Sequence, residues 1–244
     1  MTPALQATGI SVRYGGHVAV DRVDITVPDR GMVGVVGANG AGKSSLVNAL
    51  AGWSPGDRPT VRGSVQLGGK RMDGLAPHRR ARRGLVLVPQ GKAIFADLTV
   101  AENLALMRPP LRKAGRHAFS MDEIFALFPR LADRRNHKGG MLTGSERQMV
   151  AVGRALRAAP RVLLLDEPSA GQTPHLLHEL LATLRRLIDA GLSVLLVEQS
   201  VRSALELVDA LYLLERGKVA AHGPAGTMRD DPRLVEASLG RVPS

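Results

Sequence analysis

The chain has 244 residues, 44% of them apolar, a formal net charge of +11 and no cysteine. A chain of this size can bury a full core in one domain, and the lack of cysteine excludes disulfides and thiolate chemistry. No apolar run approaches the roughly 20 residues that a bilayer-spanning helix needs, and residues 1–10 show no basic segment followed by an apolar one. We therefore expect neither a membrane helix nor a secretory signal.

The positive charge gathers in three arginine-rich clusters, at residues 78–83, 112–117 and 134–138. Such clusters can attract nucleic acid or an anionic membrane surface. Only 3% of the residues are aromatic, so stacking platforms for single-stranded nucleic acid are scarce. We interpret the clusters as solvated surface, with weak attraction to anionic lipid as the next possibility, and we expect no specific nucleic-acid partner.

Short apolar and alternating runs predict strands along both ends of the chain. Residues 12–28 and 63–74 alternate and turn like antiparallel strands, and residues 211–223 read as a hairpin. Four other runs are rich in Val and Leu, too short for helices and bounded by Gly, Pro or charge, which is typical of buried parallel strands. These runs are Met32–Val36, Leu85–Val88, Val162–Leu165 and Val194–Val197.

Between residues 93 and 160 the strand pattern is absent and helices are predicted instead. They cover Val100–Met107 behind Thr99, Met121–Leu131 and Ser145–Ala158. A further amphipathic helix, residues 174–190, joins the last two parallel strands and implies a right-handed crossover. We predict one α/β domain with a mainly parallel sheet and an antiparallel β edge. Residues 1–92 and 159–244 form its core, and residues 93–158 form an inserted helical subdomain.

A phosphate-binding loop follows the first apolar strand. The pattern G-x-x-x-x-G-K-[ST] predicts that backbone N–H groups and a helix start face phosphate oxygens. In this pattern the lysine reaches the β- and γ-phosphates, and the hydroxyl of the next residue is a ligand for Mg²⁺. ATP and Mg²⁺ are thus the expected ligands of Gly37, Ala38, Asn39, Gly40, Ala41, Gly42, Lys43 and Ser44, with Ser45 beside them.

Two carboxylates end the apolar strand that starts at Val162. Asp166 is placed to hold Mg²⁺, and Glu167 is placed to orient or deprotonate the water that attacks the γ-phosphate. An acidic strand end on the surface is the alternative reading, and the phosphate loop makes it the weaker one.

Four further motifs decide among the many proteins that share those two elements. Leu142-Thr143-Gly144-Ser145-Glu146-Arg147-Gln148 resembles the LSGGQ-type signature of ABC ATPases, and Val88-Pro89-Gln90 resembles their Q-loop. Tyr14 stands where that family stacks an aromatic ring on adenine, and residues 169–174 occupy the D-loop position. The chain is identified by resemblance, over essentially its whole length, as a member of the ABC ATPases, whose fold is a P-loop NTPase core.

The resemblance implies a mechanism and further site residues. Two such domains sandwich two ATP molecules, so Thr143, Gly144 and Ser145 would contact the nucleotide bound to the other chain. Gln90 would contact the nucleotide and its metal, and Gln199 would hydrogen-bond a phosphate. The same residues at 143–146 also form a capping box that would hold a helix start without any ligand, and both readings can hold.

Three positions depart from the family pattern. Ser145 replaces the second signature glycine, which puts a side chain where backbone usually approaches nucleotide. Gln199 replaces the switch histidine and cannot carry a proton or charge, and the D-loop lacks its aspartate. A regulatory module that binds ATP and scarcely hydrolyses it is one reading of these departures, and the complete set of Lys43, Ser44, Asp166 and Glu167 opposes it.

The ending Val197-Glu198-Gln199 and the D-loop form look like one branch of the family. That branch contains the second ATPase subunit of branched-chain amino acid importers and relatives that import urea or short amides. Gln90 is found often in the urea-type relatives. The implied partners are a sister ATPase in a heterodimer or homodimer, two membrane permeases and, indirectly, an extracytoplasmic binding protein. The implied location is peripheral, on the cytoplasmic face of the plasma membrane. An ABC ATPase acting on nucleic acid or ribosomes is the alternative of another class.

Overall fold

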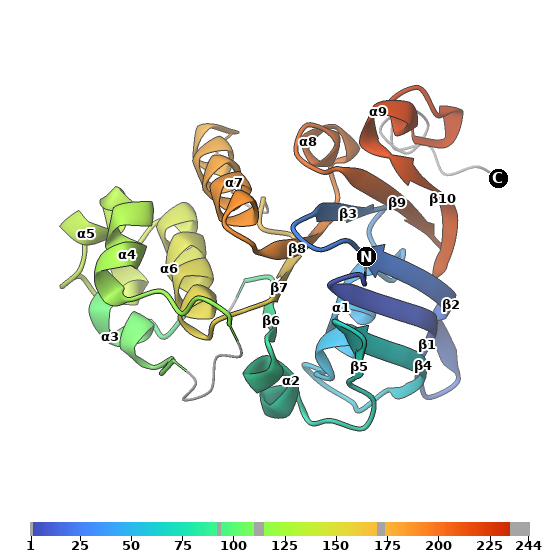
Figure 1. Cartoon of the computed structure of the whole chain (residues 1–244), viewed down its shortest axis with the longest axis horizontal. Helices are drawn as coiled ribbons and strands as arrows, with labels where there is room; N and C mark the ends of the chain where they lie inside the picture. The colour runs from blue at the N-terminus through green and yellow to red at the C-terminus, as the bar shows by residue number, and fades with distance from the viewer. Residues whose placement is uncertain (1, 92–93, 110–114, 170–173, 235–244) are drawn as a thin grey trace.

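The computed structural model describes residues 2–91, 94–109, 115–169 and 174–234, and the side chains of 174–179 and 181 lie outside that description. Two sheets and a group of helices make up the fold (Figure 1). Helices α3 to α6 lie on one side, apart from the antiparallel sheet on the other side. Within the described ranges, no helix is long and apolar enough to cross a bilayer.

The N-terminal strands form an antiparallel sheet in the order β2-β1-β4-β5. Alternation along these strands puts one face into the core, as at Leu5, Ala7, Ile10 and Val12. The predicted antiparallel edge is confirmed by the strand register, in which Leu5 lies opposite both Val27 and Leu67. The strands are β1 (Leu5–Tyr14), β2 (His17–Val27), β4 (Thr60–Leu67) and β5 (Lys70–Arg71).

The second sheet has the order β10-β9-β3-β8-β7-β6, parallel except for its β10 edge. All four predicted parallel strands and the predicted C-terminal hairpin are present. The strands are β3 (Met32–Val36), β6 (Leu85–Val88), β7 (Val162–Asp166), β8 (Ser193–Glu198), β9 (Ala210–Glu215) and β10 (Lys218–Pro224).

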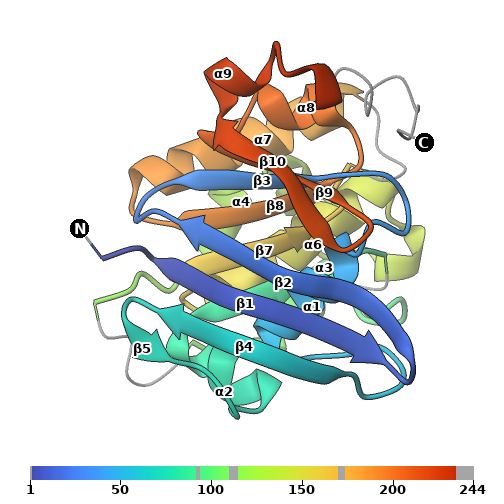
Figure 2. The same cartoon turned by 90° about the vertical axis from the view of Figure 1, so that its right-hand side faces the viewer.

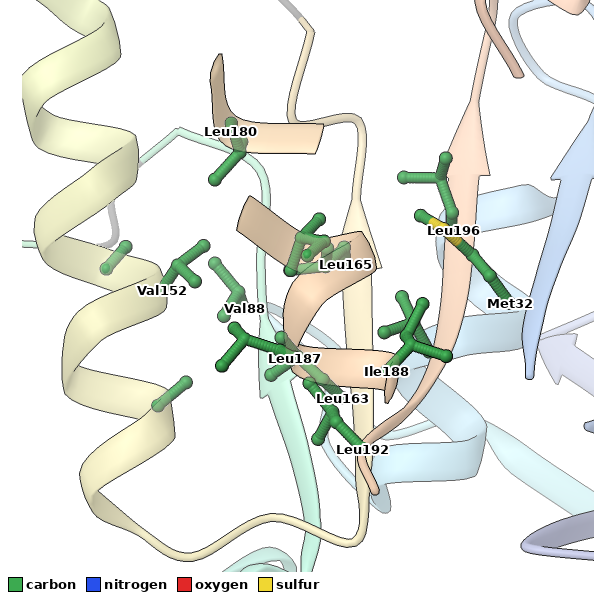
Figure 3. Packing of buried hydrophobic residues seen from close by; sticks show 14 of the residues in the cluster. Met32, Val88, Val152, Leu163, Leu165, Leu180, Leu187, Ile188, Leu192 and Leu196 are labelled. Carbon is green, nitrogen blue, oxygen red and sulfur yellow. The ribbon is translucent and has the colours of Figure 1, made fainter. Parts of the chain in front are cut away.

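Both faces of the parallel sheet are buried, which explains its unbroken apolar strands. In β3, Val33 and Val35 face the core shared with the antiparallel sheet, while Met32 and Val36 face the core under the helices. Leu163, Leu165, Leu187 and Ile188 fill the helical side (Figure 3). Helix α1 (Lys43–Ala51) packs in the core shared by the two sheets (Figure 2), so the loop that precedes it is held from both sides.

The remaining helices cover the parallel sheet and extend beyond it. One prediction here was wrong: Met121–Leu131 is two helices, because Pro129 has no N–H to continue the first one. The helices are α2 (Pro77–Arg83), α3 (Val100–Ala105), α4 (Met121–Leu127), α5 (Pro129–Asp133), α6 (Gly144–Arg157), α7 (Pro174–Asp189), α8 (Val201–Leu205) and α9 (Ala225–Met228), with a 3₁₀ turn at Gly139–Met141.

The interpretation of residues 78–83 as solvated surface was wrong for Arg80. Its side chain is buried, and its guanidinium donates to the carbonyls of Ala49 and Leu50 at 3.2 and 2.6 Å and to that of Leu75 at 3.1 Å. Burial lowers the pKa of Arg80 from its usual value. At the end of α1 the side chain therefore gives the Leu50 carbonyl its donor and adds a second donor to the Ala49 carbonyl, which also accepts from Gly52 N–H. The sequence alone did not indicate this role.

Candidate active site

The predicted site residues converge because the parallel strands end at one edge of the sheet. Val36 lies opposite Glu198, Asp166 lies opposite Val197, and Val88 lies opposite Leu165. The residues that follow these strand ends therefore meet, which is the usual place for ligands in open α/β sheets. The phosphate loop, the Asp166–Glu167 pair, Gln90 and Gln199 all start from this edge.

The loop between β3 and α1 requires glycine for two separate reasons. Gly40 and Gly42 have φ values of 79° and 102°, which L side chains rarely adopt. A Cβ atom on Gly42 would also collide with the carbonyl oxygen of Ala19 in β2. The tight curl leaves the start of α1 with no side-chain cap, so its first N–H groups are free to bind an anion.

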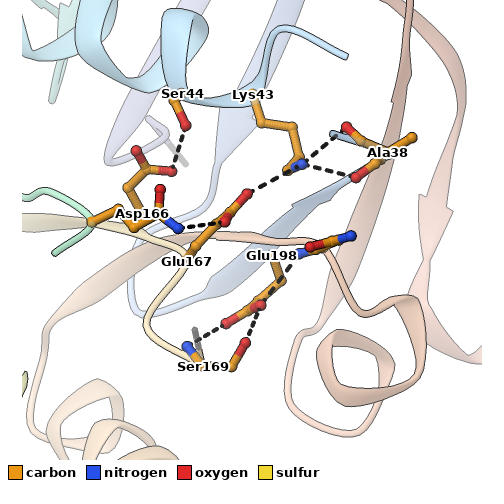
Figure 4. A network of polar contacts seen from close by, with 10 residues as sticks. Ala38, Lys43, Ser44, Asp166, Glu167, Ser169 and Glu198 are labelled. Atoms are coloured by element: carbon orange, nitrogen blue, oxygen red, sulfur yellow. Dashed lines mark hydrogen bonds and ion pairs between the residues drawn. The ribbon is translucent and has the colours of Figure 1, made fainter. Parts of the chain in front are cut away.

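Lys43 lies under this loop with only 3% of its surface exposed. Its ammonium donates to the carbonyls of Gly37 and Ala38 at 2.8 and 3.1 Å and lies 3.3 Å from the Glu167 carboxylate (Figure 4). The charge is thus held at the inner side of the phosphate loop, paired with the carboxylate expected to handle the attacking water.

The two residues predicted to bind the metal through a hydroxyl and a carboxylate, Ser44 and Asp166, contact each other. The Ser44 hydroxyl donates to Asp166 Oδ1 at 3.1 Å. Burial raises the pKa of Asp166, and the charge of Glu167 adds to the effect, while the Ser44 hydrogen bond and Lys43 partly oppose it. A nearby cation would stabilise the ionised, buried carboxylate. Hydroxyl and carboxylate oxygens are the ligands that Mg²⁺ prefers. The residues therefore fit the metal.

The Glu167 backbone adopts an unusual conformation. Its φ is 45°, in the left-handed region that a non-glycine residue enters at a cost, and its N–H donates to the Val197 carbonyl at 2.9 Å. The turn directs the carboxylate toward Lys43 and toward the Gln90 amide, which donates to it at 2.8 Å. Gln90 and Glu167, far apart in sequence, are thereby joined.

Glu198 is a site residue to which the sequence reasoning gave no role. It is buried and accepts from the Ser169 hydroxyl at 2.6 Å and the Ser169 N–H at 3.0 Å. Burial raises its pKa, while the hydrogen bonds from Ser169 lower it. The contact ties the end of β8 to the start of the predicted D-loop, whose residues 170–173 lie outside the described residues. The one sequence feature that could have pointed to Glu198 is its position directly before Gln199.

An open cleft of about 1030 Å³ connects these groups. Asp166 lies beneath Ser44 and does not line it. The predicted residues that line the cleft are Tyr14, Asn39, Gly40, Gly42, Lys43, Ser44, Ser45, Gln90, Glu167 and Gln199. Its other lining residues were not predicted: His17, Val18 and Ala19 after Tyr14, and Arg216 and Gly217 in the turn of the β9–β10 hairpin. The sequence signal for them was only that both segments are predicted hairpin turns.

The signature residues lie at the start of α6 and do not line this cleft. The predicted capping box is present: Glu146 N–H donates to the Thr143 hydroxyl at 3.3 Å, and Thr143 N–H donates to the Glu146 carboxylate at 2.8 Å. Thr143 and Gly144 are exposed, whereas Ser145 is only 7% exposed. The Ser145 side chain therefore lies mostly inside its own chain, and its effect on the nucleotide of a second chain stays a prediction.

Comparison with known proteins places the chain among transport ATPases. A family model described as "ABC transporter" matches residues 20–170. The ATP-binding protein BraG of high-affinity branched-chain amino acid transport in Pseudomonas aeruginosa is 37% identical over 95% of this chain and 97% of its own length. The probable branched-chain amino acid transport protein LivF of Archaeoglobus fulgidus is 36% identical over 93% of this chain and 94% of its own length.

Relatives with other cargo and solved structures extend the comparison. The lipopolysaccharide export protein LptB of Acidithiobacillus ferridurans is 33% identical over 98% of both chains. Among solved structures, a nucleotide-free ATP-binding cassette of an ABC transporter has a TM-score of 0.81 at 26% identity, covering 96% of this chain and 98% of that one. The ADP conformation of the cassette MJ1267 has a TM-score of 0.80 at 25% identity, covering 99% and 100%.

Proposed function

The chain belongs to the ABC transporter family, whose cassettes hydrolyse ATP, and from this premise we propose that it powers an importer for branched-chain and other hydrophobic amino acids. The observation that carries the substrate class is the 37% identity with BraG over 97% of that protein. The Val197-Glu198-Gln199 ending of β8 supports the same branch. LptB is nearly as similar at 33%, so the transport direction and the cargo are what the experiment below tests.

In this proposal the cleft binds ATP with its phosphates on the loop and its base near Tyr14. Lys43 exchanges the Glu167 carboxylate for phosphate oxygens, which frees Glu167 to orient the attacking water. Gln90 keeps the Glu167 carboxylate in place through its 2.8 Å hydrogen bond. Gln199, exposed at the cleft wall, donates an amide hydrogen bond to a phosphate without carrying charge.

Ser44 and Asp166 are the residues that would hold Mg²⁺, with Gln90 as a third ligand. Bound there, the metal supplies positive charge that neutralises the phosphate oxygens. The 3.1 Å hydrogen bond from the Ser44 hydroxyl to Asp166 already holds these two oxygens next to each other. The carboxylate is shielded from water by its burial, so it is poorly compensated in the absence of a cation.

A second ATPase subunit completes the site. Thr143 and Gly144 are exposed at the start of a 14-residue helix but lie outside the cleft of their own chain. The capping box uses the N–H groups of Thr143 and Glu146, which leaves those of Gly144 and Ser145 to favour a phosphate group. The arrangement supports a dimer in which each chain presents this start to the nucleotide of the other, either with a sister chain or with a second copy.

Two exposed apolar side chains mark the surface proposed for a membrane permease. Met141 is 70% exposed and Phe95 is 56% exposed. Their segments lie together, since Gly140 N–H donates to the Ala96 carbonyl at 2.9 Å. Phe95 follows Gln90 closely in the chain, so a permease segment seated here would contact the loop that carries a site residue. The protein would then lie peripherally on the cytoplasmic face of the membrane.

The test is a pull-down with a tagged Glu167→Gln chain from detergent-solubilised cells in MgATP. Recovery of a second ATPase and two membrane proteins is the expected result, and ligand screening of the binding protein encoded with them identifies the cargo. Binding of leucine, isoleucine or valine supports the proposal. Binding of urea or short amides moves the chain to the alternative importer class. Recovery of ribosomes or nucleic acid without membrane proteins contradicts transport altogether.

A further inference from the structure

A second hollow lies beside the nucleotide cleft, on the outer side of the antiparallel sheet. It has a volume of about 860 Å³, and five cationic side chains line it: Arg13, Arg22, Arg62, Arg216 and Lys218. They come from β1, β2, β4 and the β9–β10 hairpin, which meet at this face (Figure 2). We call the hollow that these five side chains line the basic hollow. None of the five residues belongs to the arginine-rich clusters of the sequence.

The strand register explains how the cations come together. Arg13 lies opposite Thr60, and Ser11 lies opposite Arg62, in the β1–β4 pair. Since side chains alternate along a strand, Ser11 and Arg13 share one face of the sheet. The β9–β10 turn then adds Arg216, whose φ of 46° is in the left-handed region, and Lys218.

The positive charge of the basic hollow is poorly neutralised. Asp21 is the acidic residue that lines it, lying 3.4 Å from both Arg22 and Lys218. Within the ranges that the structure describes, Arg13, Arg62 and Arg216 have no side-chain hydrogen bond or ion pair. Unpaired guanidinium groups that converge on one hollow favour a ligand with several anionic oxygens.

The other lining groups favour phosphate over an apolar or aromatic ligand. Ser11 and Thr60 contribute hydroxyls, and the Ser11 oxygen accepts from Arg22 N–H, which leaves its proton free to donate. Among the described residues, no aromatic side chain lines the basic hollow, so they offer a base no stacking platform. The volume is that of a site for a small molecule.

The basic hollow is physically joined to the phosphate loop. Arg216 and Val18 line both cavities. Asp21 N–H donates to the Gly217 carbonyl at 2.8 Å, and Gly217 N–H donates to the Ala41 carbonyl of the phosphate loop at 2.9 Å. Two anions bound on either side of Arg216 would compete for its charge and repel each other, so each weakens the other's binding.

We infer that the basic hollow is a regulatory site for a small anion carrying two or more phosphates, whose occupancy weakens ATP binding in the adjacent cleft. The anion site stands without the proposed function, whereas the coupling rests on the proposed nucleotide site. The two claims are therefore measured separately, with variants that remove one site at a time.

The first experiment titrates inorganic tripolyphosphate into four forms of the chain by calorimetry. The wild type should bind two equivalents, Lys43→Ala one, the double variant Arg13→Gln with Arg62→Gln one, and the triple variant none. Removing two of the five cations should weaken the site about tenfold or more, since hydrogen bonds to charged groups are the strong ones. A control with the same change of charge is Arg79→Gln with Arg202→Gln, both exposed and outside the basic hollow, which should bind two equivalents.

Outcomes separate the claims. If the Arg13 and Arg62 double variant titrates like the wild type, the basic hollow is not an anion site. If Lys43→Ala still binds two equivalents of tripolyphosphate while the Arg13 and Arg62 double variant loses one, the proposed nucleotide site is wrong and the anion site in the basic hollow is supported. A DNA oligonucleotide that binds with this arginine dependence, while tripolyphosphate does not, overturns the assignment of a small solute.

Two further arms address source and coupling. The first arm measures CTP and tripolyphosphate binding to Lys43→Ala. Equal affinities would mean that the ligand of the basic hollow is a bare phosphate chain, and tighter binding of CTP would mean that it is a nucleotide. In the wild type, tripolyphosphate should raise the apparent Kd of ATP more than in the double variant, by about fivefold, the lower end of typical coupling. Equal shifts in both forms would remove the coupling claim.

Discussion

Lys43, Asp166 and Glu198 are ionisable groups buried at the end of the parallel sheet. Burying a charge is costly unless it is paired and hydrogen-bonded. Each of these groups has such partners: carbonyls and Glu167 for Lys43, the Ser44 hydroxyl for Asp166, and Ser169 for Glu198. At the scale of single residues, the site is a set of buried charges, each paired through hydrogen bonds or an ion pair.

Glu167→Gln should retain ATP binding and lose most turnover. The amide keeps the size of the side chain but cannot accept a proton, a loss expected to slow the reaction by about 10²–10⁴-fold. ATPase rates and the ATP Kd measure the two effects, with Glu206→Gln, directly after α8 and outside the cleft, as the control. Unchanged turnover would refute the role given to Glu167.

Asp166→Asn should stabilise the free chain at neutral pH. Burial raises the pKa of Asp166 above its ordinary 3.8, so the folded wild type loses stability as pH rises from the unfolded pKa through the folded one. The neutral amide of the Asp166→Asn variant does not titrate, so the variant does not lose stability in this way. The stability difference should grow upward from about pH 4 and then level off. Denaturation midpoints from pH 4 to 8 measure it. A difference that is constant across this range would exclude the titration of Asp166 as its cause.

The same variant should lose the additional stability conferred by MgATP. Asp166 is a proposed ligand for the metal, and a ligand that binds only the folded chain raises its melting temperature. Wild type and variant are compared with MgATP and with ATP in EDTA. A full Mg²⁺-dependent shift in Asp166→Asn would show that other residues hold the metal.

At the scale of elements, capping boxes start three helices of the outer group. Thr99 with Glu102, Ser120 with Glu123 and Thr143 with Glu146 each exchange two hydrogen bonds. Such boxes satisfy N–H groups that the helix cannot pair. The box at Thr143 therefore has a structural explanation as well as the proposed one in nucleotide binding, and a matched pair of variants can separate them.

Thr143→Ala and Thr99→Ala should each cost about 1 kcal/mol of unfolding free energy, the usual value of a lost N-cap. Only Thr143→Ala should also reduce ATPase activity in the assembled transporter, because Thr143 is proposed to meet the nucleotide of the other chain. Urea denaturation and ATPase assays of both variants give the comparison. Equal activities in the two variants would leave Thr143 with the capping role alone.

Arg80 joins two elements, since α2 carries it and the end of α1 receives its hydrogen bonds. Arg80→Met should lower the unfolding free energy by about 2–3 kcal/mol, because the carbonyls of Leu50 and Leu75 lose the guanidinium as their donor. Arg79→Met, exposed on the same helix, should change it by less than about 0.5 kcal/mol. Similar effects from both variants would mean that Arg80 does not stabilise the α1 end.

At the scale of the whole molecule, two surfaces of the chain are proposed to meet partners. Its signature start lies outside its cleft. Phe95 and Met141 are exposed on neighbouring backbone segments, and the Arg154 guanidinium lies over the Phe95 ring at 5.7 Å from its centroid. Apolar side chains exposed together mark interaction surfaces. In the proposed assembly, these two surfaces transmit the energy of ATP hydrolysis to the membrane partner.

Met141→Glu should abolish recovery of membrane proteins in the pull-down while leaving the ATPase activity of the isolated chain unchanged. A charge placed in an apolar interface is desolvated without a partner. Trp53→Glu, at a large exposed residue elsewhere, is the matched control and should recover them normally. If Met141→Glu recovers the membrane proteins as the control does, the proposed permease surface is wrong.

The sequence by itself determined the nucleotide chemistry and most of the elements. Gly42 and Lys43 form a contiguous loop, and Asp166-Glu167 ends a strand, so local pattern and spacing were enough. The four parallel strands were predictable because both faces of that sheet are apolar. The helix break at Pro129 was not predicted, although the missing N–H of proline is a local signal.

Only the tertiary structure decided which distant residues meet. Gln90 reaches Glu167, Glu198 reaches Ser169, and Arg80 reaches the end of α1 across separate elements. The basic hollow draws its arginines from residues 13, 22, 62 and 216, which no short window of sequence contains. Periodicity and motifs report neighbours along the chain. Strand order and register fix neighbours across it, and these arise only when both sheets pack against α1.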